Sequence, residues 1–236
     1  MTVPALKSGQ LFFYEEIMLL ALRDDDGKIE NKAQFSYKHL LAGTLLAELV
    51  MLDRIKIDRG KKLLVELASS TLTGNLLLDE AITKISESKK PRGAQHWIGA
   101  FQRISNFFGK AAQSLCNRGI LAAEEGKAFL FFDKTYYPEL NPKPEQELLS
   151  RLKAAIFTDN PAIDERTLVL LALLRKSDLL KIPFDAKALR DRRHHMKDLC
   201  EGNLVGDATH KAVEAAQTAV MMAAIMPAIT TATMVH

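Results

Sequence analysis

The chain contains little cysteine and has no strong excess of charge of either sign. Among its 236 residues are two cysteines, Cys116 and Cys200, which lie far apart and have no cysteine or histidine near them at the spacing of metal ligands. This scarcity argues against a disulfide framework and against a zinc site, and it is typical of a protein in a reducing compartment. The net charge of +3 is too small to indicate nucleic-acid binding by itself. We predict no metal and no cofactor.

Recognisable catalytic motifs are missing as well. The chain has no G-x-S-x-G, no H-E-x-x-H, no Walker-type loop and no dinucleotide fingerprint. The stretch TGNLLLDEAI holds two adjacent carboxylates, Asp79 and Glu80, but neighbouring helical residues diverge by about 100°. The two therefore cannot point into one site if a helix begins near Asn75. We interpret Thr73, Gly74 and Asn75 as a turn and helix start, and we predict that the protein is not an enzyme.

No export signal is visible, and an uncharged C-terminal segment needs explaining. The first ten residues, MTVPALKSGQ, lack the basic and apolar regions of a signal peptide. Residues 218–236 carry no formal charge apart from His236, but Pro227 and several threonines favour a packed helix over a membrane anchor. The composition, 47% hydrophobic and 26% charged, is that of a globular protein. We expect a cytoplasmic protein with an N-terminal extension (1–10) and one domain (11–236).

Two segments repeat the order of a helix followed by a β-hairpin, and a buried helix over residues 11–22 precedes them. Leucines recur at helical spacing over residues 41–52, and RIKID, RGKK and LLVEL then describe a hairpin. An apolar stripe over residues 104–115 predicts the second helix. The segment AAEEGKAFLFF after it predicts a turn around Gly126 followed by a strand.

The C-terminal part is predicted to be helical. One helix covers residues 148–156, and Asn160 with Pro161 supplies start signals for the next, which runs through RTLVLLALL. Because that segment is almost entirely apolar, we expect it to be buried on most sides. Asp185 caps a basic helix that ends near Gly202. The predicted fold class is mainly α, a single compact helical domain with small β-hairpins.

The aromatic stretch FLFF offers one candidate contact surface. Strand alternation places Phe129 and Phe131 on one face of the second hairpin, and Leu130 and Phe132 on the other. Such a hairpin folds inward, pairs with another subunit or meets a lipid interface. Burial of one face in the core and cover of the other by the chain itself remains an equally weighted alternative.

Two clusters of basic residues offer another candidate surface. Each attracts phosphates or anionic headgroups at about 1 kcal/mol per basic residue close to a charged membrane, although a solvated helix face is the commoner explanation. Asp191 and Asp198 dilute the second cluster. The first cluster comprises Lys84, Lys89, Lys90 and Arg92, and the second Lys187, Arg190, Arg192, Arg193 and Lys197.

Five blocks in order carry a resemblance to a known family. EEIMLLALRDDDGKI, LAGTLLAELVMLDRI, TGNLLLDEAI with Trp97 and Ile98 after it, LCNRGIL with FLFFD, and DERTLVLLALLRKSDLL together resemble the Golgi phosphoprotein 3 family, and we expect a prokaryotic-type member. The resemblance implies a mostly helical domain without known catalytic activity. Eukaryotic members are peripheral membrane proteins that recognise phosphatidylinositol 4-phosphate and tether Golgi glycosyltransferases. The family hairpin that matches ILAAEEGKAFLFF is linked to self-association and membrane contact.

The headgroup pocket of that family is altered in this chain. An ungapped alignment of the blocks places Ala33, Ala42, Ser105 and Phe108 where eukaryotic members carry a tryptophan and three arginines. Loss of the arginines removes bidentate phosphate contacts, so we expect no tight headgroup-specific binding. Arg103 and Lys110 lie close in sequence and are the candidates for replacing part of the lost charge.

The leading hypothesis is a non-enzymatic, membrane-peripheral adaptor that binds an anionic phospholipid surface, with phosphoinositide as one candidate lipid. Its aromatic hairpin either forms a homo-oligomer or inserts into lipid. The alternative is a winged-helix-like nucleic-acid-binding protein in which RIKIDRGKK is a basic wing. The helix before that wing has no polar row to read a groove, so we expect no nucleic acid. An unfamiliar enzyme that joins His39 or His96 to Asp79 ranks last.

Overall fold

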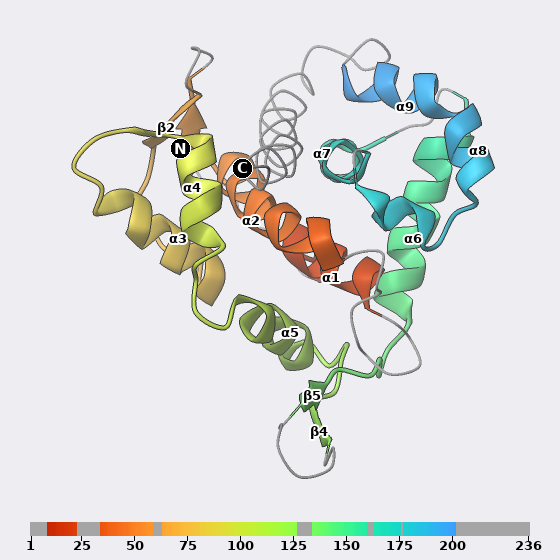
Figure 1. The fold of residues 1–236 in the computed structure, drawn as a ribbon, viewed down its shortest axis with the longest axis horizontal. Helices are drawn as coiled ribbons and strands as arrows, with labels where there is room; N and C mark the ends of the chain where they lie inside the picture. Colours follow the sequence, from red (N-terminus) through yellow and green to blue (C-terminus); the bar gives the residue numbers. More distant parts are fainter. Residues whose placement is uncertain are drawn as a thin grey trace, which may run out of the picture.

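The computed structural model describes residues 9–22, 34–58, 63–126, 134–159, 163–175 and 177–201. These residues form a mainly helical domain with two small antiparallel sheets, which confirms the predicted fold class (Figure 1). The helices are α1 (Phe13–Ala21), α2 (Gln34–Met51), α3 (Leu76–Ser86), α4 (Ala94–Phe101), α5 (Phe107–Asn117), α6 (Lys143–Phe157), α7 (Glu165–Leu174), the 3-10 helix η1 (Asp178–Lys181), α8 (Ala186–Asp191) and α9 (Arg193–Cys200).

The core forms around α1, α2 and α7. Every residue of α1 is buried, and so is every residue of α7 except Glu165 at its start, which confirms both predictions of a buried helix. In Figure 1, α2 crosses the middle of the molecule beside α1, with α3 and α4 on one side and α6 to α9 on the other. The winged-helix alternative requires a helix face that can enter a DNA groove. Residues 40–49 of α2 are all buried, so this stretch presents no such face.

The first hairpin is confirmed and has a third strand. Strand β1 (Ile55–Ile57) pairs antiparallel with β2 (Leu64–Leu67), in a register that places Lys56 opposite Glu66. Strand β3 (Arg92–Gly93), which the sequence analysis did not predict, pairs with the other edge of β2, where Val65 is opposite Arg92. The turn RGKK lies largely outside the described residues.

The second unit is a helix and an antiparallel strand pair, but its turn was placed wrongly. Strand β4 (Glu124–Gly126) pairs with β5 (Lys134–Tyr136), and Gly126 lies opposite Lys134. Gly126 is therefore a strand residue, and the connection follows it. Residues 127–133 fall outside the described residues, so Phe129, Leu130, Phe131 and Phe132 stay untested.

Two boundaries in the C-terminal part differ from expectation. Helix α7 begins at Glu165 and not beside Asn160 and Pro161, because the Asp164 carboxylate caps it by accepting a hydrogen bond from the Thr167 N–H at 3.0 Å. Asp185 does cap α8, as predicted, but the basic helix is divided at Arg192. There the guanidinium donates to the Ile156 carbonyl at 2.8 Å, which ties this corner to α6.

A fully buried ion pair joins three elements of the core. The carboxylate of Glu48 in α2 accepts two hydrogen bonds from Arg166 in α7, at 2.6 and 3.0 Å, and one from the Phe13 N–H at 2.8 Å. Arg166 also donates to the Leu11 carbonyl at 2.9 Å, and its guanidinium lies 4.0 Å from the centre of the Phe13 ring. The pair therefore fixes the start of α1 against both neighbouring helices.

The two glutamates of α1 reach arginines at the margin of the core. Glu15 accepts from the Arg118 Nε at 2.9 Å and from Ser114 of α5, whereas Glu16 pairs with Arg151 of α6. Burial raises the pKa of Glu16 to about 7 against the opposing effect of Arg151. One oxygen of Glu16 has no hydrogen-bond partner among the described residues.

Candidate functional site

The turn before α3 has the structural role predicted for it. One oxygen of the Asp79 carboxylate accepts from the Thr73 N–H at 2.6 Å and from the Thr73 hydroxyl at 2.7 Å, and the other accepts from the Gly74 N–H at 3.1 Å. Gly74 has φ +79°, a conformation that glycine adopts readily. The Asn75 side chain caps the helix by accepting from the N–H groups of Leu77 and Leu78.

Glu80 has different partners from its neighbour. Its carboxylate lies 2.6 Å from the Lys110 ammonium of α5 and 3.5 Å from that of Lys84. Partial burial acts to raise the pKa of Glu80, but Lys110 and Lys84 together outweigh it, and the pKa is lowered. The two carboxylates thus serve separate contacts, and they do not form a catalytic pair.

Arg103 and Lys110, the two candidates for headgroup binding, differ in exposure and in ion pairing. The Lys110 side chain is partly buried in its pair with Glu80, so its charge is already compensated. Arg103 follows α4, is exposed and forms no ion pair with another described residue. Its guanidinium lies close to Gly99 in α4. A Cβ added to that glycine would be 3.8 Å from the Arg103 Nη1.

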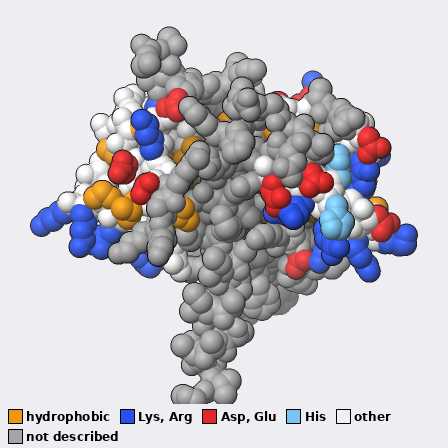
Figure 2. Space-filling model, turned by 90° about the horizontal axis from the view of Figure 1, so that it is seen from above, with side chains coloured by type: hydrophobic (Ala, Val, Ile, Leu, Met, Phe, Trp, Pro, Cys, Tyr) orange, Lys and Arg blue, Asp and Glu red, His pale blue; other side chains and the backbone are white. Residues whose placement is uncertain are grey.

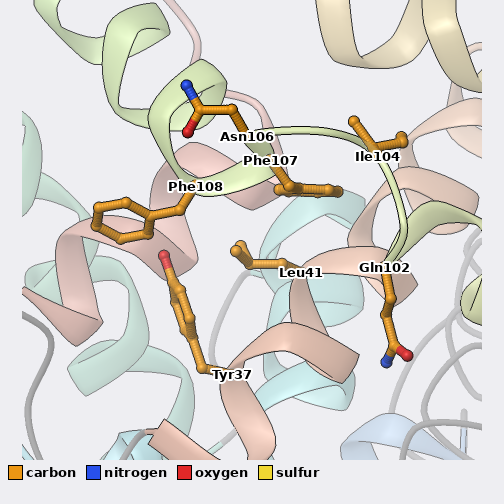
Figure 3. Close-up of a pocket in the computed structure, with 7 residues that line it drawn as sticks. All are labelled: Tyr37, Leu41, Gln102, Ile104, Asn106, Phe107 and Phe108. Atoms are coloured by element: carbon orange, nitrogen blue, oxygen red, sulfur yellow. The ribbon is translucent and has the colours of Figure 1, made fainter.

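A pocket of about 370 Å³ lies beside these candidates (Figure 3). It opens between the first half of α2 and the connection from α4 to α5, and neither Arg103 nor Lys110 is among its described lining residues. Of the positions aligned with the family headgroup pocket, Phe108 lines it, Ala42 is buried in α2, Ser105 is exposed and Ala33 falls outside the described residues. The described lining consists of Tyr37, Leu41, Gln102, Ile104, Asn106, Phe107 and Phe108.

The two basic clusters differ in how much of their charge is compensated. In the second cluster, Lys187, Arg192 and Lys197 lie within 3.8 Å of a carboxylate, whereas Arg190 and Arg193 are exposed and form no ion pair with another described residue. In the first, Lys84 pairs with Glu80, but Lys89, Lys90 and Arg92 are exposed and form no ion pair within the described part of the chain. We call these last three residues the basic edge.

An exposed leucine adjoins the basic edge. Val65 of β2 pairs with Arg92, and Leu67 lies two residues further along the same strand. Leu67 is 37% exposed, and Leu72 in the connection to α3 and Leu76 at the start of α3 are more exposed still. Figure 2 shows Lys and Arg side chains along the left edge, with hydrophobic and some acidic side chains next to them, and a mixture of basic, acidic and histidine side chains at the right. Sequence reasoning missed these leucines, because a strand end, a loop and the first residue of a helix carry no periodic signal.

Other chemistry finds little support in the described residues. They contain no group of three or more histidine, cysteine, aspartate or glutamate side chains placed to hold a metal ion. Neither His39 nor His96 is among the described residues that line the pocket, and Asp79 is engaged by its own turn. No helix in the described part of the chain is long and apolar enough to cross a membrane, and the uncharged segment 218–236 lies outside that part.

Comparison with known proteins agrees with the resemblance drawn from the five blocks. A family model described as Golgi phosphoprotein 3 (GPP34) matches residues 13–216. Vacuolar protein sorting-associated protein 74 of the fission yeast Schizosaccharomyces pombe is 27% identical over 169 residues, a match that covers 64% of this chain and 49% of that protein. The match thus spans about half the length of this curated relative. Because the relative is eukaryotic, the expectation of a prokaryotic-type member is not borne out.

Proposed function

Because the chain belongs to the Golgi phosphoprotein 3 (GPP34) family, we propose that it is a non-enzymatic adaptor that attaches peripherally to anionic membranes on their cytoplasmic side. The basic edge carries this proposal. Its three cations are exposed and form no ion pair with another described residue, and Arg92 lies on the strand paired with β2, which ends in the exposed Leu67. Uncompensated cations approach anionic headgroups without first breaking an internal ion pair, and an adjacent apolar side chain adds contact with the acyl boundary.

The basic edge sets the expected strength of binding. Each lysine or arginine near an anionic surface contributes about 1 kcal/mol, so three of them account for about 3 kcal/mol, or on the order of 100-fold in the partition coefficient. This attraction falls with rising salt, because the Debye length shrinks from about 10 Å at 0.1 M to about 3 Å at 1 M. The proposed binding is therefore reversible and sensitive to salt.

Flotation with vesicles tests the proposal. The variant Lys89→Ser/Lys90→Ser/Arg92→Ser is compared with Lys181→Ser/Lys187→Ser/Lys197→Ser on phosphatidylcholine vesicles with and without phosphatidylserine. Both triple variants lose three positive charges, but each lysine of the second lies within 3.8 Å of a carboxylate. We expect the first variant to lose most binding to anionic vesicles and the second to keep most of it. Equal losses, or equal recovery of the parent protein with neutral and anionic vesicles, would contradict the proposal.

Headgroup preference is a separate part of the proposal. Arg103 contributes to phosphate attraction because its charge is uncompensated, whereas Lys110 contributes little while it is paired with Glu80. Vesicles matched in total charge, containing either phosphatidylinositol 4-phosphate or phosphatidylserine, are expected to bind equally. Arg103→Ser lowers binding to both by roughly fivefold, and Lys110→Ser changes it by less than about twofold. A strong preference for the phosphoinositide would refute the loss of headgroup specificity.

The aromatic hairpin remains a prediction of the sequence. Phe129 to Phe132 lie outside the described residues, and we propose that they contact lipid or a second copy of the chain. Phe131→Ser/Phe132→Ser separates the two roles. A lipid contact predicts weaker flotation with an unchanged mass in light scattering, and a subunit contact predicts a smaller mass. A variant unchanged in both measurements would assign these rings to the protomer itself.

A further inference from the structure

The pocket between α2 and the α4–α5 connection has walls suited to an uncharged ligand. Its volume of about 370 Å³ falls within the range of roughly 300 to 1,000 Å³ typical of small-molecule sites. Leu41, Ile104, Phe107 and Phe108 supply an apolar surface, and none of the described lining residues carries a formal charge. A phosphate group placed there would lose its hydration without gaining a cation from this lining.

Two polar groups of this lining have no hydrogen-bond partner among the described residues, the Tyr37 hydroxyl and the Gln102 Nε2. Tyr37 is 2% exposed, and its hydroxyl accepts and donates no hydrogen bond among the described residues. Its ring packs edge-on against Phe108, with the ring centres 6.2 Å apart. Figure 3 shows the hydroxyl between Phe108 and Leu41. Burial raises the pKa of Tyr37 far above its ordinary value, so the phenol stays protonated and available as a donor.

The amide side chains of the pocket do not supply the missing acceptor. The Asn106 amide lies over α5, where a Cβ added to Gly109 would come within 2.4 Å of both its oxygen and its nitrogen. In Figure 3 the Gln102 amide, whose Nε2 also lacks a partner, points away from the Tyr37 hydroxyl. A water molecule needs two to four polar partners to be held in a buried site, and the hydroxyl provides one. The site therefore favours a ligand that brings an acceptor on an apolar body.

We propose that this pocket binds a neutral, mainly apolar small molecule that presents a carbonyl oxygen to the Tyr37 hydroxyl. The oxygen accepts the hydrogen bond that the protein leaves unmade, and the rest of the ligand contacts Leu41, Ile104 and Phe108. This site goes beyond the proposed membrane attachment and does not depend on it. Its ligand class also differs from the charged headgroups that the basic edge attracts.

Benzophenone is a suitable probe, because diphenylmethane is a nearly matched molecule without the carbonyl. Binding of each to the full chain is measured by isothermal titration. We expect benzophenone to bind roughly three- to tenfold more tightly, the range that one neutral hydrogen bond supports. Irradiation of bound benzophenone forms covalent bonds to nearby C–H groups, and we expect peptide mapping to place the label within residues 37–41 and 104–108.

Two tyrosine variants provide matched controls. Tyr14 is buried like Tyr37, but its hydroxyl donates to Ser114 at 3.0 Å and accepts from the Asn75 amide at 2.6 Å. Tyr37→Phe is expected to abolish the preference for benzophenone without lowering the thermal midpoint, since it removes an unpaired hydroxyl. Tyr14→Phe is expected to lower the midpoint and to keep the preference.

Several outcomes would overturn the proposed site. These are equal affinity for the two probes, a preference that survives Tyr37→Phe, and labelling mapped elsewhere in the chain. Displacement of benzophenone by soluble inositol 1,4-bisphosphate would instead identify a phosphate pocket and would equally refute a neutral ligand. The labelling experiment uses the parent protein, so it decides the location even if a variant folds poorly.

Discussion

The ion pair between Glu48 and Arg166 provides the sharpest test of how this core is held together. The variant Arg166→Met keeps an unbranched side chain of helical propensity but removes the guanidinium. The Glu48 carboxylate, which is fully buried, then loses both hydrogen bonds from Arg166 and keeps the one from the Phe13 N–H. The Leu11 carbonyl loses its donor as well.

The structure sets the expected magnitude. Removing one partner of a buried ion pair leaves an uncompensated charge and costs about 3 to 5 kcal/mol. Since domains of this size unfold with about 5 to 15 kcal/mol, the variant should lose a large share of its stability. At roughly 2 to 4 °C per kcal/mol, its thermal midpoint should fall by about 6 to 20 °C.

Urea unfolding followed by tryptophan fluorescence measures this change. The chain has one tryptophan, Trp97, which is 4% exposed and therefore reports on the core. The double variant Glu48→Gln/Arg166→Met removes both charges, and its amide oxygen still accepts from the Phe13 N–H. We expect the double variant to be more stable than Arg166→Met alone, because no buried charge remains unpaired.

Two results would refute this reasoning. A loss below about 1 kcal/mol for Arg166→Met would mean that the carboxylate reaches solvent or another cation, as exposed pairs do. A double variant less stable than Arg166→Met would mean that the Glu48 charge is not the source of the cost.

Further predictions concern a titrating group and two glycines. The pKa of Glu16 is about 7 in the folded protein against 4.5 ordinarily, so its contribution to stability is present below about pH 4.5 and is lost as the pH rises to about 7. The difference in free energy of unfolding between the parent protein and Glu16→Gln should therefore fall across that pH window, by about 3 kcal/mol at most. A difference that does not change with pH would contradict the burial argument. Gly74→Ala should destabilise by about 1 kcal/mol because its φ of +79° strains an L residue. Gly99→Ala in α4 should stabilise the protein by about 0.5 to 1 kcal/mol, because alanine restricts the unfolded chain and its Cβ has room, with one Arg103 atom at 3.8 Å. A higher thermal midpoint for Gly74→Ala than for Gly99→Ala would refute both predictions.

Local patterns in the sequence predicted most of the elements correctly. Helices α1 and α7 were expected to be buried because both segments are largely apolar. The turn at Gly74 and the cap at Asn75 follow from local hydrogen bonding between residues two to six positions apart. By contrast, α4 was missed although Ala94, Trp97, Ile98 and Phe101 follow helical spacing, since the segment is only eight residues long.

The candidate site was harder to predict, because its properties depend on partners far along the chain. Lys110 was chosen for its position beside the aligned headgroup residues, and the sequence carries no sign that it pairs with Glu80, thirty residues earlier. In the second cluster, Lys187 and Lys197 pair with carboxylates four positions away, but Arg192 pairs with Asp159, thirty-three residues earlier, and the sequence carries no sign of that pair. The unpaired hydroxyl of Tyr37 is likewise visible only once its surroundings are known.

From its residues alone this chain specifies a mainly helical domain, its turns, most of its helices and its family, because hydrophobic periodicity, caps and glycine conformations act over a few neighbouring positions. Tertiary structure decided which charged side chains form ion pairs within the protein and which remain free to bind a partner. Glu15, Glu16 and Glu48 find their arginines at separations of 103, 135 and 118 residues. Such pairings result from how the helices pack, and no local pattern encodes them.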